Sequence, residues 1–94
     1  RHKRSYELQV AWDELAECSP PDEGDVSALT DALNEFLDGL ESTERRLFVG
    51  RYWHLYPVSV LADTYGLTAN NASVRLFRLR ERLRVYLKER GFNV

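Results

Sequence analysis

Residues 56–91 read YPVSVLADTYGLTANNASVRLFRLRERLRVYLKERG, and this stretch predicts two helices separated by a tight turn. Pro57 suits the first turn of a helix, because the N–H that proline lacks would have no partner there. Gly66 can end the first helix in the left-handed conformation of a cap. Thr68 can cap the second helix, expected over residues 69–90, by accepting a hydrogen bond from a backbone N–H of its first turn.

Small residues recur in this stretch where two helices would have to approach closely. Ala62 and Ala72 flank the turn at Gly66, and apolar Leu61 and Leu67 lie beside them. Two helices joined by about three residues, with small residues at the crossing, are typical of a helix-turn-helix. A plain helical hairpin is the alternative that the same pattern allows.

The second predicted helix has two chemically different sides. Its apolar stripe, at helical spacing, consists of Ala72, Leu76, Leu79, Leu83, Tyr86 and Leu87. The opposite side of its first half carries Asn70, Asn71, Ser73, Val74, Phe77 and Arg78, and Arg75, Arg80, Arg82 and Arg84 surround them. Arginine, asparagine and serine donate hydrogen bonds to base edges and phosphates, and valine or phenylalanine can contact a thymine methyl group. The pattern therefore favours a DNA-reading helix.

Charge is divided unevenly along the 94 residues. The net charge is −2, yet residues 5–41 contain eleven acids and no lysine or arginine. Residues 42–94 contain ten basic residues against four acids. An ordinary salt-bridged surface would not segregate the signs in this way, so the distribution favours a nucleic-acid partner although the overall balance is acidic.

Several function classes find no support in the sequence. No apolar run approaches membrane-spanning length, and no signal peptide is recognisable. The single cysteine, Cys18, cannot form an intramolecular disulfide, so we expect a reduced, cytoplasmic setting. His54 stands alone, without a nucleophile or ligand partner at useful spacing. We therefore expect no enzyme, no catalytic residue, no cofactor and no metal site.

The residues before the turn predict two further helices and a linker. Residues 6–17 fit either a strand or a helix, and we favour a helix because no other segment offers a strand partner. The sequence CSPPDEG at residues 18–24 breaks any helix, and Asp25 can cap a helix over 26–38. A second helix is expected from Ser42 or Thr43 to about residue 53.

In this second helix we expect the apolar residues to face the core and the arginines to face solvent. The inward set comprises Leu47, Phe48, Tyr52 and, just beyond the helix, Leu55, and the outward set comprises Arg45, Arg46 and Arg51. The chain is thus predicted to be all-α, with residues 1–25 a linker that can hold a short extra helix and residues 26–94 a compact domain of four helices.

Four segments together resemble region 4 of bacterial sigma factors of the sigma-70 superfamily, in the compact form of the extracytoplasmic-function type. They are residues 40–53 (LESTERRLFVGRYW), 61–62 (LA), 65–68 (YGLT) and 74–84 (VRLFRLRERLR). The resemblance covers about residues 26–91, and its most specific part is RLFRLRERLR at 75–84. Residues 1–25 would then be the linker from a preceding sigma domain.

This resemblance implies a domain that binds the upstream (−35) promoter element and contacts the flap of the RNA polymerase beta subunit. It also allows for an anti-sigma factor. It implies that Arg51 holds a backbone phosphate and that the DNA-reading positions lie on the last helix. The full DNA-binding set is Arg51, Asn70, Asn71, Ser73, Val74, Arg75, Phe77 and Arg78. Ser73, Val74 and the Asn70–Asn71 pair depart from the residues usual in the family, which leaves the target sequence open.

Two other interpretations fit parts of the sequence. The DNA-binding domain of a LuxR-type response regulator shares the helix-turn-helix, but its last helix is shorter and lacks the long arginine-rich tail. A helical protein-interaction module would instead use the acidic residues 7–41 as its working surface. Salt-dependent duplex binding separates this module from both DNA-binding interpretations.

Overall fold

The structure, a computed structural model, describes residues 9–11, 13–16 and 26–94, and every regular element among them is a helix. The helices are α2 (Val26–Asp38), α3 (Ser42–Tyr52), α4 (Val58–Thr64) and α5 (Ala69–Glu89), preceded by a helical segment at 9–11 and 13–16. The all-α prediction is therefore confirmed, with bounds close to those expected. No helix in this part of the chain is long and apolar enough to cross a membrane.

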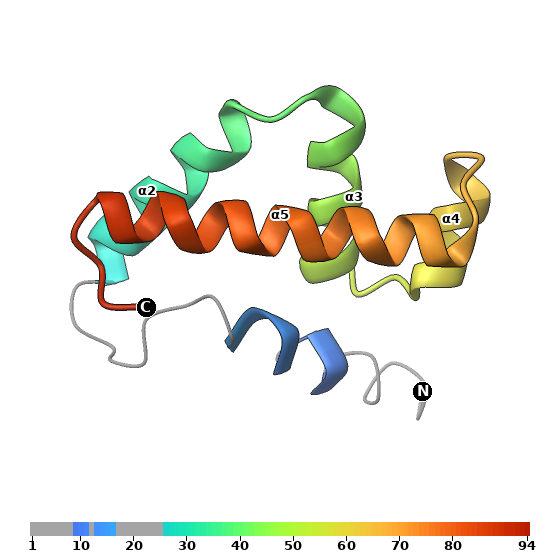
Figure 1. The fold of residues 1–94 in the computed structure, drawn as a ribbon, viewed down its shortest axis with the longest axis horizontal. Helices are drawn as coiled ribbons and strands as arrows, with labels where there is room; N and C mark the ends of the chain where they lie inside the picture. The colour runs from blue at the N-terminus through green and yellow to red at the C-terminus, as the bar shows by residue number, and fades with distance from the viewer. Residues whose placement is uncertain (1–8, 12, 17–25) are drawn as a thin grey trace.

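Helix α5 is the longest element, and the others are arranged along it (Figure 1). Helix α4 contacts its N-terminal end, α3 its middle and α2 its C-terminal half. The predicted stripe explains this arrangement, because Ala72, Leu76, Leu79, Leu83 and Leu87 are all buried. The apolar sides of the three shorter helices thus pack against one continuous apolar edge of α5.

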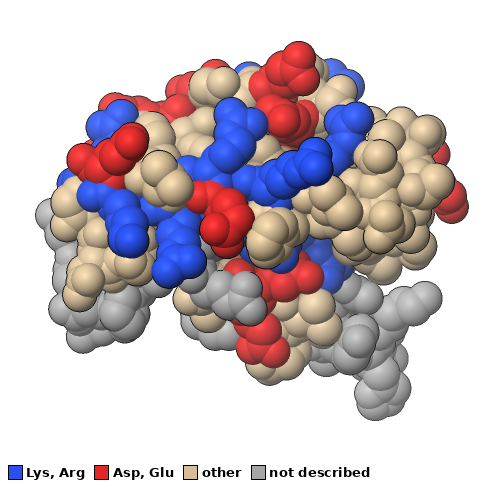
Figure 2. Space-filling view, in the orientation of Figure 1, with Lys and Arg blue, Asp and Glu red and all other residues tan. Residues whose placement is uncertain are grey.

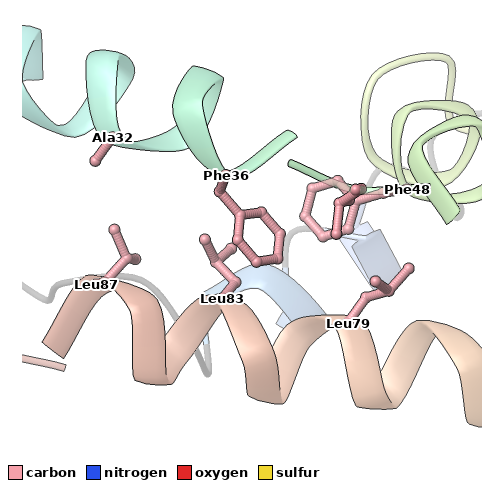
Figure 3. Packing of buried hydrophobic residues seen from close by; sticks show 7 residues of the cluster. Ala32, Phe36, Phe48, Leu79, Leu83 and Leu87 are labelled. Carbon is pink, nitrogen blue, oxygen red and sulfur yellow. The ribbon is translucent and has the colours of Figure 1, made fainter. Parts of the chain in front are cut away.

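The core consists of two clusters on this edge. The larger joins α2, α3 and the C-terminal half of α5, and comprises Ala32, Phe36, Leu40, Phe48, Leu79, Leu83 and Leu87 (Figure 3). Within it the rings of Phe36 and Phe48 meet edge-on, with centroids 6.1 Å apart. The smaller cluster joins α3, α4 and the start of α5 through Leu47, Leu61 and Leu76. Tyr52 packs against both, so it lies at their junction.

The turn between α4 and α5 has the conformation that the sequence predicts. Gly66 has a φ of 68°, and the N–H of Leu67 donates to the carbonyl of Ala62 at 2.8 Å, which closes the end of α4 as a Schellman motif. The side chain of Thr68 accepts a hydrogen bond from the N–H of Asn71 at 3.0 Å and caps α5. Both capping predictions are confirmed, and they fix how α5 leaves the turn.

Residues 26–94 hold four helices, as expected, and the described residues hold one further helical segment, so that five are present in all. The fifth is the segment at 9–11 and 13–16, where we expected a short extra helix in the linker. Its Ala11 is buried and its Leu15 packs against the larger core cluster. The expected linker loop at 18–24 and the cap at Asp25 lie outside the described residues.

Candidate nucleic-acid interface

The first three turns of α5 present one continuous outward face. Burial of Ala72, Leu76 and Leu79 on the opposite side forces the residues between them outward. The exposed residues on this face are Asn70, Asn71, Ser73, Val74, Phe77 and Arg78. These are six of the eight residues predicted to bind DNA, so the structure brings most of the predicted set together on one helix.

Two of these exposed side chains are apolar. Phe77 is 52% exposed and Val74 is 37% exposed, although both lie on a helix whose other side is fully buried. The guanidinium of Arg80 lies 5.7 Å from the centre of the Phe77 ring. An aromatic ring exposed beside a cation offers both an apolar contact and a positive charge to a partner.

Arg75 takes a different position from its neighbours on this face. It is only partly exposed, and its Nε donates to the side-chain oxygen of Asn71 at 2.9 Å. This hydrogen bond links two members of the predicted set and orients the Asn71 amide. The Arg75 side chain is thus held against Asn71 on this face.

The arginines of α5 differ in how their charge is balanced. Figure 2 shows Lys and Arg side chains gathered along α5, with acids between them. Arg82 pairs with Glu44 at 3.2 Å and Arg90 pairs with Glu35 at 2.9 Å. Within the described part of the chain, by contrast, no acid lies within ion-pair distance of Arg78. Its exposed guanidinium therefore keeps a positive charge that no described acid balances.

Arg51 is the clear correction to the predicted site. It was expected to face solvent, but it is only 3% exposed. Arg51 follows Leu47 by four residues and Phe48 by three, so it lies on the same inward side of α3 as these two buried residues. We expected it outside because arginine is rarely buried. Its Nη1 donates to the carbonyl of Tyr56 at 3.0 Å, which holds the turn after α3. Removing Arg51 would therefore remove a structural contact.

A carboxylate from the N-terminal segment compensates this buried charge. Glu14 Oε1 lies 3.4 Å from Arg51 Nε and 3.6 Å from Arg80 Nη1, and it accepts a hydrogen bond from the Tyr52 hydroxyl at 2.7 Å. The same hydroxyl accepts a hydrogen bond from Arg80 at 2.7 Å. Burial raises the pKa of Tyr52 far above its usual value, and the neighbouring Glu14 carboxylate adds to the shift. We call these four residues the Glu14 cluster.

Sequence reasoning missed most of the Glu14 cluster. The spacing of Arg51 from Leu47 and Phe48 could have identified it as an inward residue. Glu14 and Arg80, in contrast, are 66 positions apart in the numbering and lie on helices with no local signal linking them. Only the tertiary arrangement brings them together.

A second surface feature is an apolar groove among the N-terminal segment, α2, α3 and α5. It encloses a hollow of about 130 Å³, lined by residues that include Leu15, Leu33, Leu37, Val49 and Trp53. Trp53 is 69% exposed at its edge. An exposed tryptophan beside an apolar hollow is the kind of surface that binds a partner's apolar side chains.

Comparisons with protein-family models, with curated proteins and with solved structures find no match to this chain.

Proposed function

We propose that this chain is a promoter DNA-binding domain, equivalent to region 4 of an extracytoplasmic-function sigma factor, which recognises the −35 element during transcription initiation. The observation that carries the proposal is the outward face of α5. It combines exposed amide, hydroxyl and guanidinium donors with exposed Val74 and Phe77, and no acid among the described residues pairs with Arg78. These groups match what a DNA major groove offers.

The arrangement of α4 and α5 supports the same proposal. The two helices pack against each other, Ala62 of α4 and Ala72 of α5 are 2% and 0% exposed, and the Gly66 turn sets the entry of α5. In a helix-turn-helix, the first helix crosses the DNA backbone while the N-terminal residues of the second contact base edges. Helix α5 would be that second helix.

Each residue of the face takes a role from its chemistry. Arg78 can donate to both acceptors of a guanine, and Asn70, Asn71 and Ser73 can donate to bases or phosphates. Val74 and Phe77 can contact thymine methyl groups. Arg51 can act as the backbone anchor only after its ion pair with Glu14 breaks.

The length of α5 favours a sigma-type domain over a LuxR-type domain. After the predicted reading face, α5 continues as one helix to Glu89 and carries Arg80, Arg82 and Arg84 in its middle. A LuxR-type last helix is shorter and lacks such a tail.

Contact with the beta-subunit flap is the second part of the proposal, and the groove beside Trp53 is its place. We expect Trp53→Ala to weaken binding of a flap peptide, because it removes the exposed edge of the groove. The control is Val85→Ala, at a residue that is 54% exposed on α5 outside the groove. NMR shifts induced by the peptide on the start of α5 alone would contradict this placement.

Selection from a pool of randomised duplexes tests the proposed function. The chain should enrich a shared motif, and its affinity for that motif should fall linearly on a log–log plot between about 50 and 200 mM salt. A scrambled duplex of the same composition is the control. Recovery of the pool without enrichment, together with no measurable duplex binding, would overturn the proposal.

A further inference from the structure

The N-terminal helical segment, described at residues 9–11 and 13–16, lies against the domain with most of its described residues at least partly exposed. Ala11 is buried and Leu15 is partly buried against the core, whereas Gln9, Asp13 and Ala16 are exposed. Glu14 supplies the polar attachment, through Tyr52, Arg51 and Arg80. Among the described residues of this segment only Ala11 is buried, and segments that bury little apolar surface open at a lower free-energy cost than the core.

The polar attachment borders the proposed DNA-binding face. Arg80 belongs to the Glu14 cluster, and its guanidinium also lies 5.7 Å from the ring of exposed Phe77. Arg51 pairs with the same carboxylate oxygen. One acid thus pairs with two arginines, of which Arg80 borders the surface where a duplex would lie.

We propose that residues 9–16 form a releasable strap that restrains DNA binding, an inference that rests on the function proposed above. While the strap is docked, the Glu14 carboxylate accepts a hydrogen bond from Arg51 and forms an ion pair with Arg80. A phosphate group is an anion with the same hydrogen-bonding preference for guanidinium, so an incoming duplex competes directly with Glu14. Release of the strap gives the duplex a further basic contact at Arg80, beside Phe77.

The substitution Glu14→Gln tests the strap, because it removes the charge and keeps the shape and an oxygen that can accept from Tyr52. We expect the variant to bind duplex roughly threefold to tenfold more tightly than the wild type, since weakening an ion pair of this kind frees its cations. Its salt dependence should be steeper by about one unit for each arginine that gains a phosphate.

Glu35→Gln is the matched control. This substitution also removes one negative charge and one ion pair, because Glu35 lies 2.9 Å from Arg90. Arg90 follows the end of α5, far along the helix from Phe77. Affinity within twofold of the wild type is expected for this control. Amide hydrogen exchange supplies a readout without DNA: in Glu14→Gln, protection should fall at residues 9–16 while α3 and α5 keep theirs.

The outcomes separate the strap from the proposed function. Equal gains in affinity for Glu14→Gln and Glu35→Gln would mean a general charge effect and overturn the strap. Continued protection of residues 9–16 in the wild-type complex with duplex would overturn it as well. If none of the three chains bound duplex, the proposed function itself would fail, and the strap inference with it.

Discussion

Tyr52 is the residue at which the two core clusters and the Glu14 cluster meet. Its ring packs against Phe48 with centroids 4.8 Å apart, and its hydroxyl lies between Glu14 and Arg80. Burial and the carboxylate both favour the neutral phenol, which raises its pKa in the folded chain. The phenol therefore stays protonated while the fold persists.

This shift predicts how stability depends on alkaline pH. The pKa of Tyr52 is higher in the folded chain than its ordinary value of about 10 in the unfolded chain. Its contribution to stability is therefore complete below about pH 10 and is lost as the pH rises further. Urea unfolding between about pH 8 and 11 should show this decline, and Tyr52→Phe should make it shallower. An equal decline in both chains would contradict the prediction.

Gly66 is a residue whose backbone conformation can be tested directly. Its φ of 68° lies in the left-handed region, where a β-branched side chain is strained. Gly66→Val should therefore lower the free energy of unfolding by about 1–3 kcal/mol. Gly39→Ala is the control, because a Cβ there would make only ordinary contacts, the nearest at 3.7 Å. A melting temperature unchanged by Gly66→Val would place the turn elsewhere.

At the scale of helices, the crossing of α4 on α5 positions the proposed reading face. Ala62 is 2% exposed at this crossing. Ala62→Leu would overpack it, at a cost of about 1–3 kcal/mol in unfolding free energy. Val60→Leu, on the same helix but 44% exposed, is the control and should change stability little. If the two variants unfolded at the same urea concentration, α4 would not pack on α5 through Ala62.

Local sequence signals were sufficient to predict the position of most of the helices. The stripe of α5, the Thr68 cap and the Gly66 turn follow from periodicity and backbone chemistry, which act over a few residues. The crossing of α3 on α4 was missed: a Cβ on Gly50 would come within 2.8 Å of the Leu61 side chain. That close approach depends on tertiary packing, which periodicity does not encode.

The site was predictable to a lesser degree than the helices. The exposed residues of α5 were found because their alternation with the leucines shows which side they occupy. Arg51 was misplaced because its charge suggested solvent, whereas its position in α3 and its pairing with Glu14 decide its burial. A buried charge is tolerated when a partner compensates it, and the partner here is distant in sequence.

At the scale of the whole molecule, the fold uses its acidic half to balance part of its basic half. Glu14, Glu35 and Glu44 come from the acidic N-terminal half or the start of α3, and each pairs with an arginine of α5. The pairs lie along the middle and end of α5. The first three turns keep the positive charge of Arg78, so a net charge of −2 coexists with a basic group on the face that we propose reads DNA.

The central claim, that α5 reads bases, is tested most directly by the base-pair preference of Arg78→Ala. Binding is measured for the selected duplex and for each of its single-base-pair variants, with wild type, Arg78→Ala and the control Arg84→Ala. Arg84 is also exposed on α5, but it lies beyond the first three turns. A bidentate arginine contributes about 1–3 kcal/mol of discrimination at one base pair.

We predict that Arg78→Ala loses the preference at one base pair and keeps it at the others, whereas Arg84→Ala retains every preference. If Arg78→Ala instead weakened binding to all duplexes by the same factor, Arg78 would contact only the phosphate backbone, and the assignment of base reading to it would be wrong.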